Sequence, residues 1–324
     1  MKILVVGGAG YIGFITVQEL LKRGYEVVIF DHFQCHSPDK IKPIPFIKGD
    51  ITHFDEIKQA LEQTKPDAVI HFAAYIQMGE SVQDPRKYYY NNVVGSMNLA
   101  NAMVETGVDK LVFSSSAGVY GNPQRIPIQE DDPKLPTNPY GETKLVVERL
   151  LRWYEQPYGL RSISIRYFNA AGAALDGSLG EDHQPESHLI PNIIKAQLEG
   201  REFTLFGDDY PTEDGTCVRD YIHVVDLAAA HIAALEKLQA GASSNYYNAG
   251  TGQGYSNKQI IQMVEKVSGK PIRVKVLPRR PGDANILIAD TTKIHRELNW
   301  EPKYSDLETI IKTAYRWHQQ HEQA

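Results

Sequence analysis

The chain contains 324 residues, of which 42% are hydrophobic and 23% are charged, and its formal net charge is −6. This composition indicates a globular protein of one large or two modest domains, without the basic run typical of nucleic-acid binding or the apolar run of about 20 residues that a membrane span needs. The two cysteines, Cys35 and Cys217, show neither disulfide nor metal-ligand spacing, so we expect a cytoplasmic protein with reduced thiols and no metal site.

Short apolar segments alternate with helical patterns through the first half of the chain. Six segments read as strands, namely KILVVGG, EVVIFD, PFIKGD, DAVIHFAA, KLVFSSS and SISIRYFN, and helices are expected near 11–23, 54–63, 85–106 and 140–156. The apolar runs are continuous, as in parallel strands that are buried on both faces. This order predicts an α/β fold on a doubly wound parallel sheet of the Rossmann type.

The texture changes near residue 172, where a loop rich in Gly, Ala and Asp begins. Beyond it, strands are expected in CVRDYIHV, SNYYNAG and PIRVKVL, and helices near 187–199, 224–238, 256–268 and 305–319. We therefore expect a Rossmann domain over 1–171 and a second, smaller α/β domain for the substrate over 172–324. A later strand or helix is allowed to rejoin the first sheet.

A glycine-rich turn follows the first strand and opens the first helix. Gly7, Gly10 and Gly13 permit a tight turn and a close approach of the backbone to a pyrophosphate, and the helix N-terminus adds N–H donors. Asp31 ends the next strand, where its carboxylate can accept hydrogen bonds from ribose hydroxyls and repel a 2′-phosphate. The pattern predicts NAD rather than NADP as cofactor, with Asp50 as a contact for the adenine.

Tyr140 and Lys144 lie four residues apart in NPYGETK and share one helix face. Ser114, Ser115 and Ser116 end a strand, and ligands bind at the carboxyl ends of parallel strands. A nearby ammonium and a positive nicotinamide are expected to lower the pKa of the tyrosine from about 10. The phenolate then accepts a proton from a substrate hydroxyl, with a serine as relay, while hydride leaves the same carbon. A Tyr–Lys pair alone is more often a surface pair, so this interpretation depends on the glycine turn.

Longer motifs carry a resemblance that covers nearly the whole chain, namely GGAGYIG, GDI, VIHFAA, GESVQDP, YYYNNVVGS, FSSSAGVYG, PYGETK, RYFNAAG, FGDDYPTEDGTCVRDYIHV, YNAGTGQG, RRPGD and ELNW. Through them the sequence resembles the extended short-chain dehydrogenase/reductase family, and within it the nucleotide-sugar 4-epimerases. The resemblance implies tightly held NAD, a UDP-hexose substrate, a nucleotide-sugar-binding domain over 172–324, and a homodimer formed through helices near 91–106 and 140–156. It also implies the reaction. Hydride passes from C4 of UDP-glucose or UDP-galactose to NAD, the 4-keto sugar swings about its link to the diphosphate, and hydride returns to the other face.

The resemblance implies a role for individual residues. Tyr140 is the base, Lys144 orients the nicotinamide ribose, and Ser116 binds the 4-hydroxyl. The remaining implied cofactor contacts are Gly7, Gly10, Tyr11, Ile12, Gly13, Asp31, Asp50, Ile51, Phe72, Ala73, Ala74, Asn91, Ser114 and Tyr167. Arginine forks suit phosphate geometry, and the remaining implied substrate contacts are Asn169, His188, Leu189, Phe206, Arg219, Tyr221, Arg280, Asp283 and Leu287.

Four positions depart from the common pattern of these relatives. Val6 stands where a threonine often precedes the glycines. Ile76 replaces a lysine found near the cofactor phosphates, so one cationic contact is missing. His188 replaces an asparagine at the sugar edge, where it is expected to contact the sugar or cap a helix. Leu287 is smaller than the tyrosine associated with excluding N-acetylated sugars, so these substrates stay open.

The residues present bear on several alternative functions. A 4,6-dehydratase is disfavoured because Ala117-Gly118 stands where the dehydratases carry an Asp-Glu pair. A UDP-N-acetylglucosamine or UDP-glucuronate 4-epimerase stays open. A non-catalytic NAD-binding sensor ranks lower, because Tyr140, Lys144 and the serine are all present.

Overall fold

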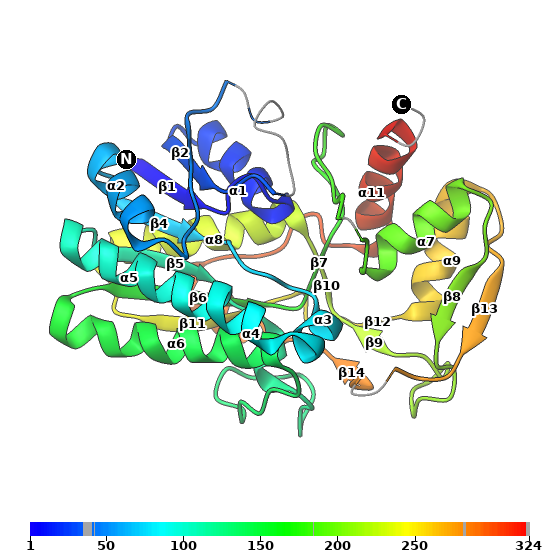
Figure 1. Cartoon of the computed structure of the whole chain (residues 1–324). Coiled ribbons are helices and arrows are strands. Elements are labelled where there is room, and N and C mark those ends of the chain that lie inside the picture. The colour runs from blue at the N-terminus through cyan, green and yellow to red at the C-terminus, as the bar shows by residue number, and fades with distance from the viewer. Residues whose placement is uncertain (35–40, 42, 184, 281–282, 322–324) are drawn as a thin grey trace.

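A seven-stranded parallel sheet forms the centre of the computed structural model, which describes residues 1–34, 41, 43–183, 185–280 and 283–321 (Figure 1). The strand order is β11-β6-β5-β4-β1-β2-β3. The bounds are β1 Lys2–Val6, β2 Glu26–Asp31, β3 Phe46–Lys48, β4 Ala68–His71, β5 Lys110–Ser114, β6 Arg161–Tyr167 and β11 Asn245–Ala249. The doubly wound parallel sheet predicted from the sequence is confirmed.

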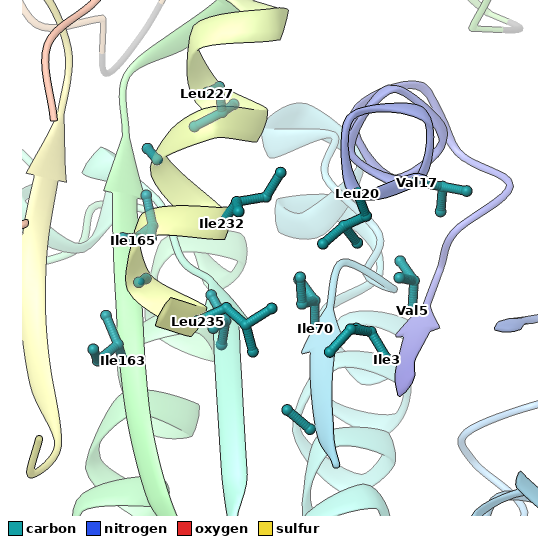
Figure 2. Packing of buried hydrophobic residues seen from close by; sticks show 14 of the residues in the cluster. Ile3, Val5, Val17, Leu20, Ile70, Ile163, Ile165, Leu227, Ile232 and Leu235 are labelled. Carbon is teal, nitrogen blue, oxygen red and sulfur yellow. The ribbon is translucent and has the colours of Figure 1, made fainter. Parts of the chain in front are cut away.

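Helices cover both faces of the sheet. One face is covered by α1 (Tyr11–Lys22) and α8 (Val224–Gln239), and the other by α2 (Phe54–Thr64), α5 (Gly95–Thr106) and α6 (Pro139–Tyr158). The first core lies between the sheet and α1 and α8, and the second lies between the sheet and α2, α5 and α6. In β1, Ile3 and Val5 belong to the first core and Leu4 and Val6 to the second, and all four side chains are fully buried. Figure 2 shows the first core, in which side chains of β1, β4 and β6 meet those of α1 and α8. Burial on both faces explains why these strands are continuously apolar.

Strand β11 and helix α8 come from the second half of the chain but belong to this layered unit. β11 pairs with β6 in parallel, from Asn245 opposite Ile163 to Ala249 opposite Tyr167. The sheet therefore extends past residue 171, as the sequence analysis allowed, and the division at 171/172 stays a prediction.

The helix predicted near 85–106 is composite. It comprises α4 (Pro85–Tyr88), a π-helical turn η2 (Tyr89–Val94) and α5, and the short helix α3 (Met78–Gln83) precedes it. The π-helical turn is a local widening that sequence periodicity does not reveal, and such turns occur frequently at functional sites.

The other residues of the second half form a smaller unit. The strands β8 (Phe203–Phe206) and β13 (Val274–Leu277) pair in parallel, and a three-stranded sheet joins β12 (Tyr255–Ser256), β9 (Val218–Arg219) and β14 (Ile286–Leu287). β7 (Asn169–Ala171) pairs with β10 (Tyr221–His223), so the strand predicted in CVRDYIHV is split at Asp220. The helices of this unit are α7 (Leu189–Leu198), α9 (Asn257–Ser268) and α11 (Leu307–His321), whereas α10 (Thr292–Leu298) packs in the core that α8 shares with the large sheet. α7, α9 and α11 share a buried core with β8.

Among the described residues, no helix is long and apolar enough to span a membrane. Cys217 is buried and free, whereas Cys35 lies outside the described residues.

Candidate active site

The glycine turn between β1 and α1 is built for close backbone packing. Gly7 has φ +79°, and a Cβ there would lie 2.4 Å from the backbone nitrogen of Ala73, in the segment after β4. A Cβ on Gly13 would lie 2.2 Å from the carbonyl oxygen of Gly7. Side chains at these positions would break the turn, so its residues fit the phosphate cradle of a dinucleotide.

The carboxylate of Asp31 lies beside this turn. It accepts hydrogen bonds from the backbone N–H of Ala9 (3.1 Å) and of Phe33 (2.9 Å). Burial alone would raise the pKa of Asp31, but hydrogen bonds from His32, Phe33 and Ala9 outweigh that effect and lower the pKa. Asp31 is therefore an ionised acceptor beside the cradle, which suits a ribose diol and disfavours a 2′-phosphate.

Helix α6 positions the predicted tyrosine–lysine pair. The side chain of Asn138 caps its first turn by accepting from the backbone N–H of Gly141 at 2.9 Å. Tyr140 and Lys144 follow on one face, and both are buried. The Lys144 ammonium donates to the carbonyl of Ser114 at the end of β5 (2.8 Å) and lies 6.0 Å from the centre of the Tyr140 ring. The helix thus brings the predicted tyrosine and lysine to the carboxyl end of β5.

Burial sets the protonation of this pair. It raises the pKa of Tyr140, with a further rise from Tyr167 that a hydrogen bond from Ser116 opposes only in part. Burial lowers the pKa of Lys144 to about 7, against an opposing effect of the Glu148 carboxylate. In the chain alone, desolvation of the phenol dominates. The lowering expected from an ammonium together with a positive nicotinamide stays a prediction. Ionisation of Tyr140 therefore needs positive charge from outside the described residues.

A buried ion pair supports α6 from behind. Glu148, one turn after Lys144, accepts from Arg166 Nη2 at 2.6 Å, from Arg166 Nε at 2.8 Å and from the Ser115 hydroxyl at 2.5 Å. Arg166 Nη1 also donates to the Tyr120 hydroxyl at 2.8 Å. The two charged side chains are 1–2% exposed. This network fixes α6 against β5 and β6, and the sequence analysis missed it.

Two aromatic rings, near the ends of β4 and β6, pack against one histidine ring of α8. The ring of Phe72 lies 4.8 Å from the ring of His231, and Tyr167 lies 6.3 Å from that same imidazole. The Ser114 hydroxyl donates to the Tyr167 hydroxyl at 3.3 Å. His231, from α8, was not predicted from the sequence.

The side chains of the other predicted cofactor residues differ in burial and in the hydrogen bonds that they already make. Ile51 is buried in the core between α2 and α5, so its side chain serves packing. Asp50 accepts from the backbone N–H and the hydroxyl of Thr52, both at 2.8 Å. Asn91 is buried in η2 and donates to the side chain of Asn92 at 2.9 Å. The remaining predicted residues lie in the glycine turn and α1 (Gly10, Tyr11, Ile12) or directly after β4 (Ala73, Ala74).

The predicted substrate residues form small groups in the second half. Arg219 on β9 is the register partner of Leu287 on β14, and the guanidinium of Arg280 stacks over the ring of Phe206 at 4.1 Å. Asn169 on β7 and Tyr221 on β10 are also register partners. Leu287 packs against the cluster that contains Ala117, Tyr120 and Leu145, so β14 reaches the neighbourhood of α6. Burial raises the pKa of Tyr210, and the charge of the Asp283 carboxylate contributes to that rise.

His188 precedes α7, next to Leu189, and its side chain makes no capping hydrogen bond. Of the two alternatives for this residue, capping of the helix by its side chain is therefore wrong, and contact with the sugar stays a prediction. Its Nδ1 instead lies 2.6 Å from Glu181 Oε1 and 3.4 Å from Glu186 Oε1. Burial alone would lower the pKa of His188, but the two carboxylates raise it to about 10.

A family model for the NAD dependent epimerase/dehydratase family matches residues 3–250, and the chain belongs to this family. Among curated relatives, it is 49% identical to the UDP-glucose 4-epimerase of Halalkalibacterium halodurans over 99% of this chain and 96% of that protein. The UDP-glucose 4-epimerase of Brucella ovis in complex with NAD is 44% identical, with a TM-score of 0.94 over 97% of each chain. The UDP-Glc/GlcNAc 4-epimerase of Campylobacter jejuni is 41% identical, with a TM-score of 0.85 over 98% of this chain and 99% of that one. The resemblance to nucleotide-sugar 4-epimerases is confirmed.

Proposed function

We propose that the chain is a UDP-glucose 4-epimerase that interconverts UDP-glucose and UDP-galactose with NAD held in the cradle after β1. The observation that carries the proposal is the buried Tyr140–Lys144 pair at the carboxyl end of β5, with Lys144 bound to the Ser114 carbonyl. Whole-length similarity to UDP-glucose 4-epimerases supports the substrate.

Bound NAD supplies the hydride acceptor for sugar C4 and a positively charged nicotinamide ring. The residues of the chain handle the proton. The Tyr140 oxygen takes the proton of the 4-hydroxyl, and Ser116 holds that hydroxyl. The Ser116 oxygen is itself fixed, since it accepts from the backbone N–H of Gly118 at 3.0 Å. After oxidation the 4-keto sugar turns about its link to the diphosphate, and Tyr140 returns the proton when C4 is reduced on the other face.

Arg219 and Arg280 anchor the diphosphate in this proposal. A guanidinium presents a planar fork of donors that matches phosphate oxygens. Phe206 and Leu189 border the uracil, Asp283 accepts from the ribose, and Tyr221 and Asn169 flank the diphosphate or sugar. Anchoring at the diphosphate while the sugar stays free is what rotation of the 4-keto sugar requires.

The test is conversion of UDP-galactose followed by NMR on protein purified without added cofactor, with and without NAD. We expect UDP-glucose to form without accumulation of reduced cofactor. Tyr140→Phe should lower kcat by about 10²–10⁴-fold, because it removes the proton acceptor. Tyr25→Phe is the matched control, since Tyr25 is no predicted site residue and its hydroxyl donates to the exposed side chain of Glu236 at 3.3 Å. Absence of conversion with NAD present would refute the proposal, and UDP-glucuronate would be tested next.

Leu287 favours a second substrate class, the N-acetylhexosamines. This residue pairs with the position of Arg219 and leaves more room than a tyrosine. Parallel assays with UDP-N-acetylgalactosamine separate a glucose-specific enzyme from a dual one.

A homodimer through α5 and α6 also belongs to this proposal. Large apolar side chains are exposed there, with Trp153 at 75%, Tyr158 at 58% and Met97 at 36% exposure. Such exposure is unusual for a face that stays in water. We expect Trp153→Glu to shift the mass measured by light scattering to that of one chain. We also propose galactose metabolism as the setting of this reaction, and the cytoplasmic location stays a prediction of the sequence.

A further inference from the structure

Four potential metal ligands gather in the segment before α7, and one of them, His188, is also a predicted substrate contact. They are Glu181, His183, Glu186 and His188, and one ligand atom of each lies within 4.8 Å of those of the others. Glu181 Oε1 is 2.6 Å from His188 Nδ1 and 3.1 Å from His183 Nδ1. Two imidazole nitrogens and two carboxylates thus face a common centre.

Within the described residues, one carboxylate oxygen of this cluster has no hydrogen-bond partner. The Glu186 side chain is 6% exposed, yet its Oε2 is buried without a hydrogen-bond partner among the described residues. Its other oxygen accepts from the backbone N–H groups of Ser187 (2.8 Å) and His188 (2.9 Å). A buried carboxylate oxygen without a partner is costly. A cation among these four side chains would give it one.

The donor set defines the class of ion. Imidazole nitrogens with carboxylate oxygens and no thiolate suit Zn²⁺ and related divalent transition metals rather than Ca²⁺ or Mg²⁺. Four ligands about 2.1 Å from a tetrahedral Zn²⁺ are about 3.4 Å apart. The separations here bracket that value, so small rotations of the side chains close the site. Binding of the ion would displace the proton of His188, and the charge of the two carboxylates then balances a divalent ion.

The cluster joins the cofactor cradle to the substrate region. The ring of His183 meets the ring of Tyr11 edge-on at 6.5 Å, and Tyr11 begins α1 directly after Gly10 of the glycine turn. His188 directly precedes α7, whose first residue is Leu189. We propose that Glu181, His183, Glu186 and His188 bind one divalent transition-metal ion of the Zn²⁺ class, which fixes this segment between the cradle and α7.

The test measures metal content directly. Untagged protein is treated with chelator, dialysed against micromolar Zn²⁺ and analysed for zinc by mass spectrometry, and Co²⁺ is added to a second sample. We expect about one ion per chain, a Co²⁺ absorption typical of tetrahedral nitrogen and oxygen ligands, and a higher Tm with metal. His183→Ala and Glu186→Gln should lower zinc retention at least tenfold.

The matched control is His53→Ala, because the exposed His53 Nδ1 also lies 2.9 Å from a glutamate, Glu56. It should retain zinc like the unmodified protein. Less than a tenth of an ion per chain, or equal retention in Glu186→Gln, would overturn the proposal. If a variant fails to fold, the Co²⁺ spectrum of the unmodified protein decides, and absence of the tetrahedral bands overturns it. Both readouts are made without substrate, so they are independent of the epimerase assay.

Discussion

Burial of the charged Lys144 side chain should lower the free energy of unfolding of the cofactor-free protein at low pH. Replacing Lys144 by methionine should therefore raise the free energy of unfolding there. Burial lowers its pKa from 10.5 to about 7, a shift that corresponds to about 5 kcal/mol between the charged and neutral limits. Between pH 7 and 10.5 the unfolded chain holds a proton that the folded chain has released, so the free energy of unfolding rises with pH in this window. Below pH 7 both states are protonated and the full cost remains.

The assay is urea unfolding of Lys144→Met and of the unmodified chain at pH 6 and pH 9, both freed of NAD. Loss of the hydrogen bond to Ser114 offsets about 1–2 kcal/mol, so the variant should be more stable by about 3 kcal/mol at pH 6. This gain should fall by about 3 kcal/mol by pH 9, and activity should be lost at both pH values. Lys22→Met is the control, because the Lys22 side chain at the end of α1 is 64% exposed. A stability difference that is independent of pH, or a loss at pH 6, would refute the reasoning.

Further predictions concern the cradle, the ion pair and the sugar pocket. Gly7→Ala should abolish NAD binding measured by calorimetry, whereas Gly24→Ala, at a similar φ of +81° but with no atom within 4 Å of the added Cβ, should only lower stability by about 1 kcal/mol. Equal NAD affinity in the two variants would contradict the steric argument. Glu148→Gln should lower the free energy of unfolding by about 3–5 kcal/mol, because it leaves the Arg166 charge buried without its partner; a change below about 1 kcal/mol in urea would show that the pair is dispensable. Leu287→Tyr should lower kcat/KM for UDP-N-acetylgalactosamine more than for UDP-galactose, and an equal effect on both would remove Leu287 from the sugar pocket.

The sequence predicted the features that are local in the chain. The glycine turn, each of the six first-half strands and the Tyr140–Lys144 spacing depend on residues that are close in sequence. The continuous apolar runs of the strands reflect burial on both faces of the sheet. The strand SNYYNAG was predicted, but its place beside β6 was not, because pairing between distant segments leaves no local pattern.

The features that the sequence analysis missed depend on tertiary contacts. Arg166 and Glu148 meet only when β6 packs under α6. The raised pKa of Tyr140 follows from desolvation, which requires the whole surrounding core. The Glu/His cluster has a compact spacing in EDHQPESH, which the spacing of the two cysteines does not reveal. A search for Glu and His at short spacing would have found it.

The place of β11 at the end of the sheet has a consequence for synthesis of the chain. β6 pairs with β5 on one side. Its other edge stays unpaired until β11 is synthesised, and β11 begins about 80 residues later in the chain. At a translation rate of 5–20 residues per second, that edge stays open for roughly 4–16 s. An unpaired edge of buried parallel strand is a template for pairing with other chains. The nascent protein therefore has to be shielded until the ribosome has passed residue 249, and a fragment that stops at residue 171 keeps the open edge permanently.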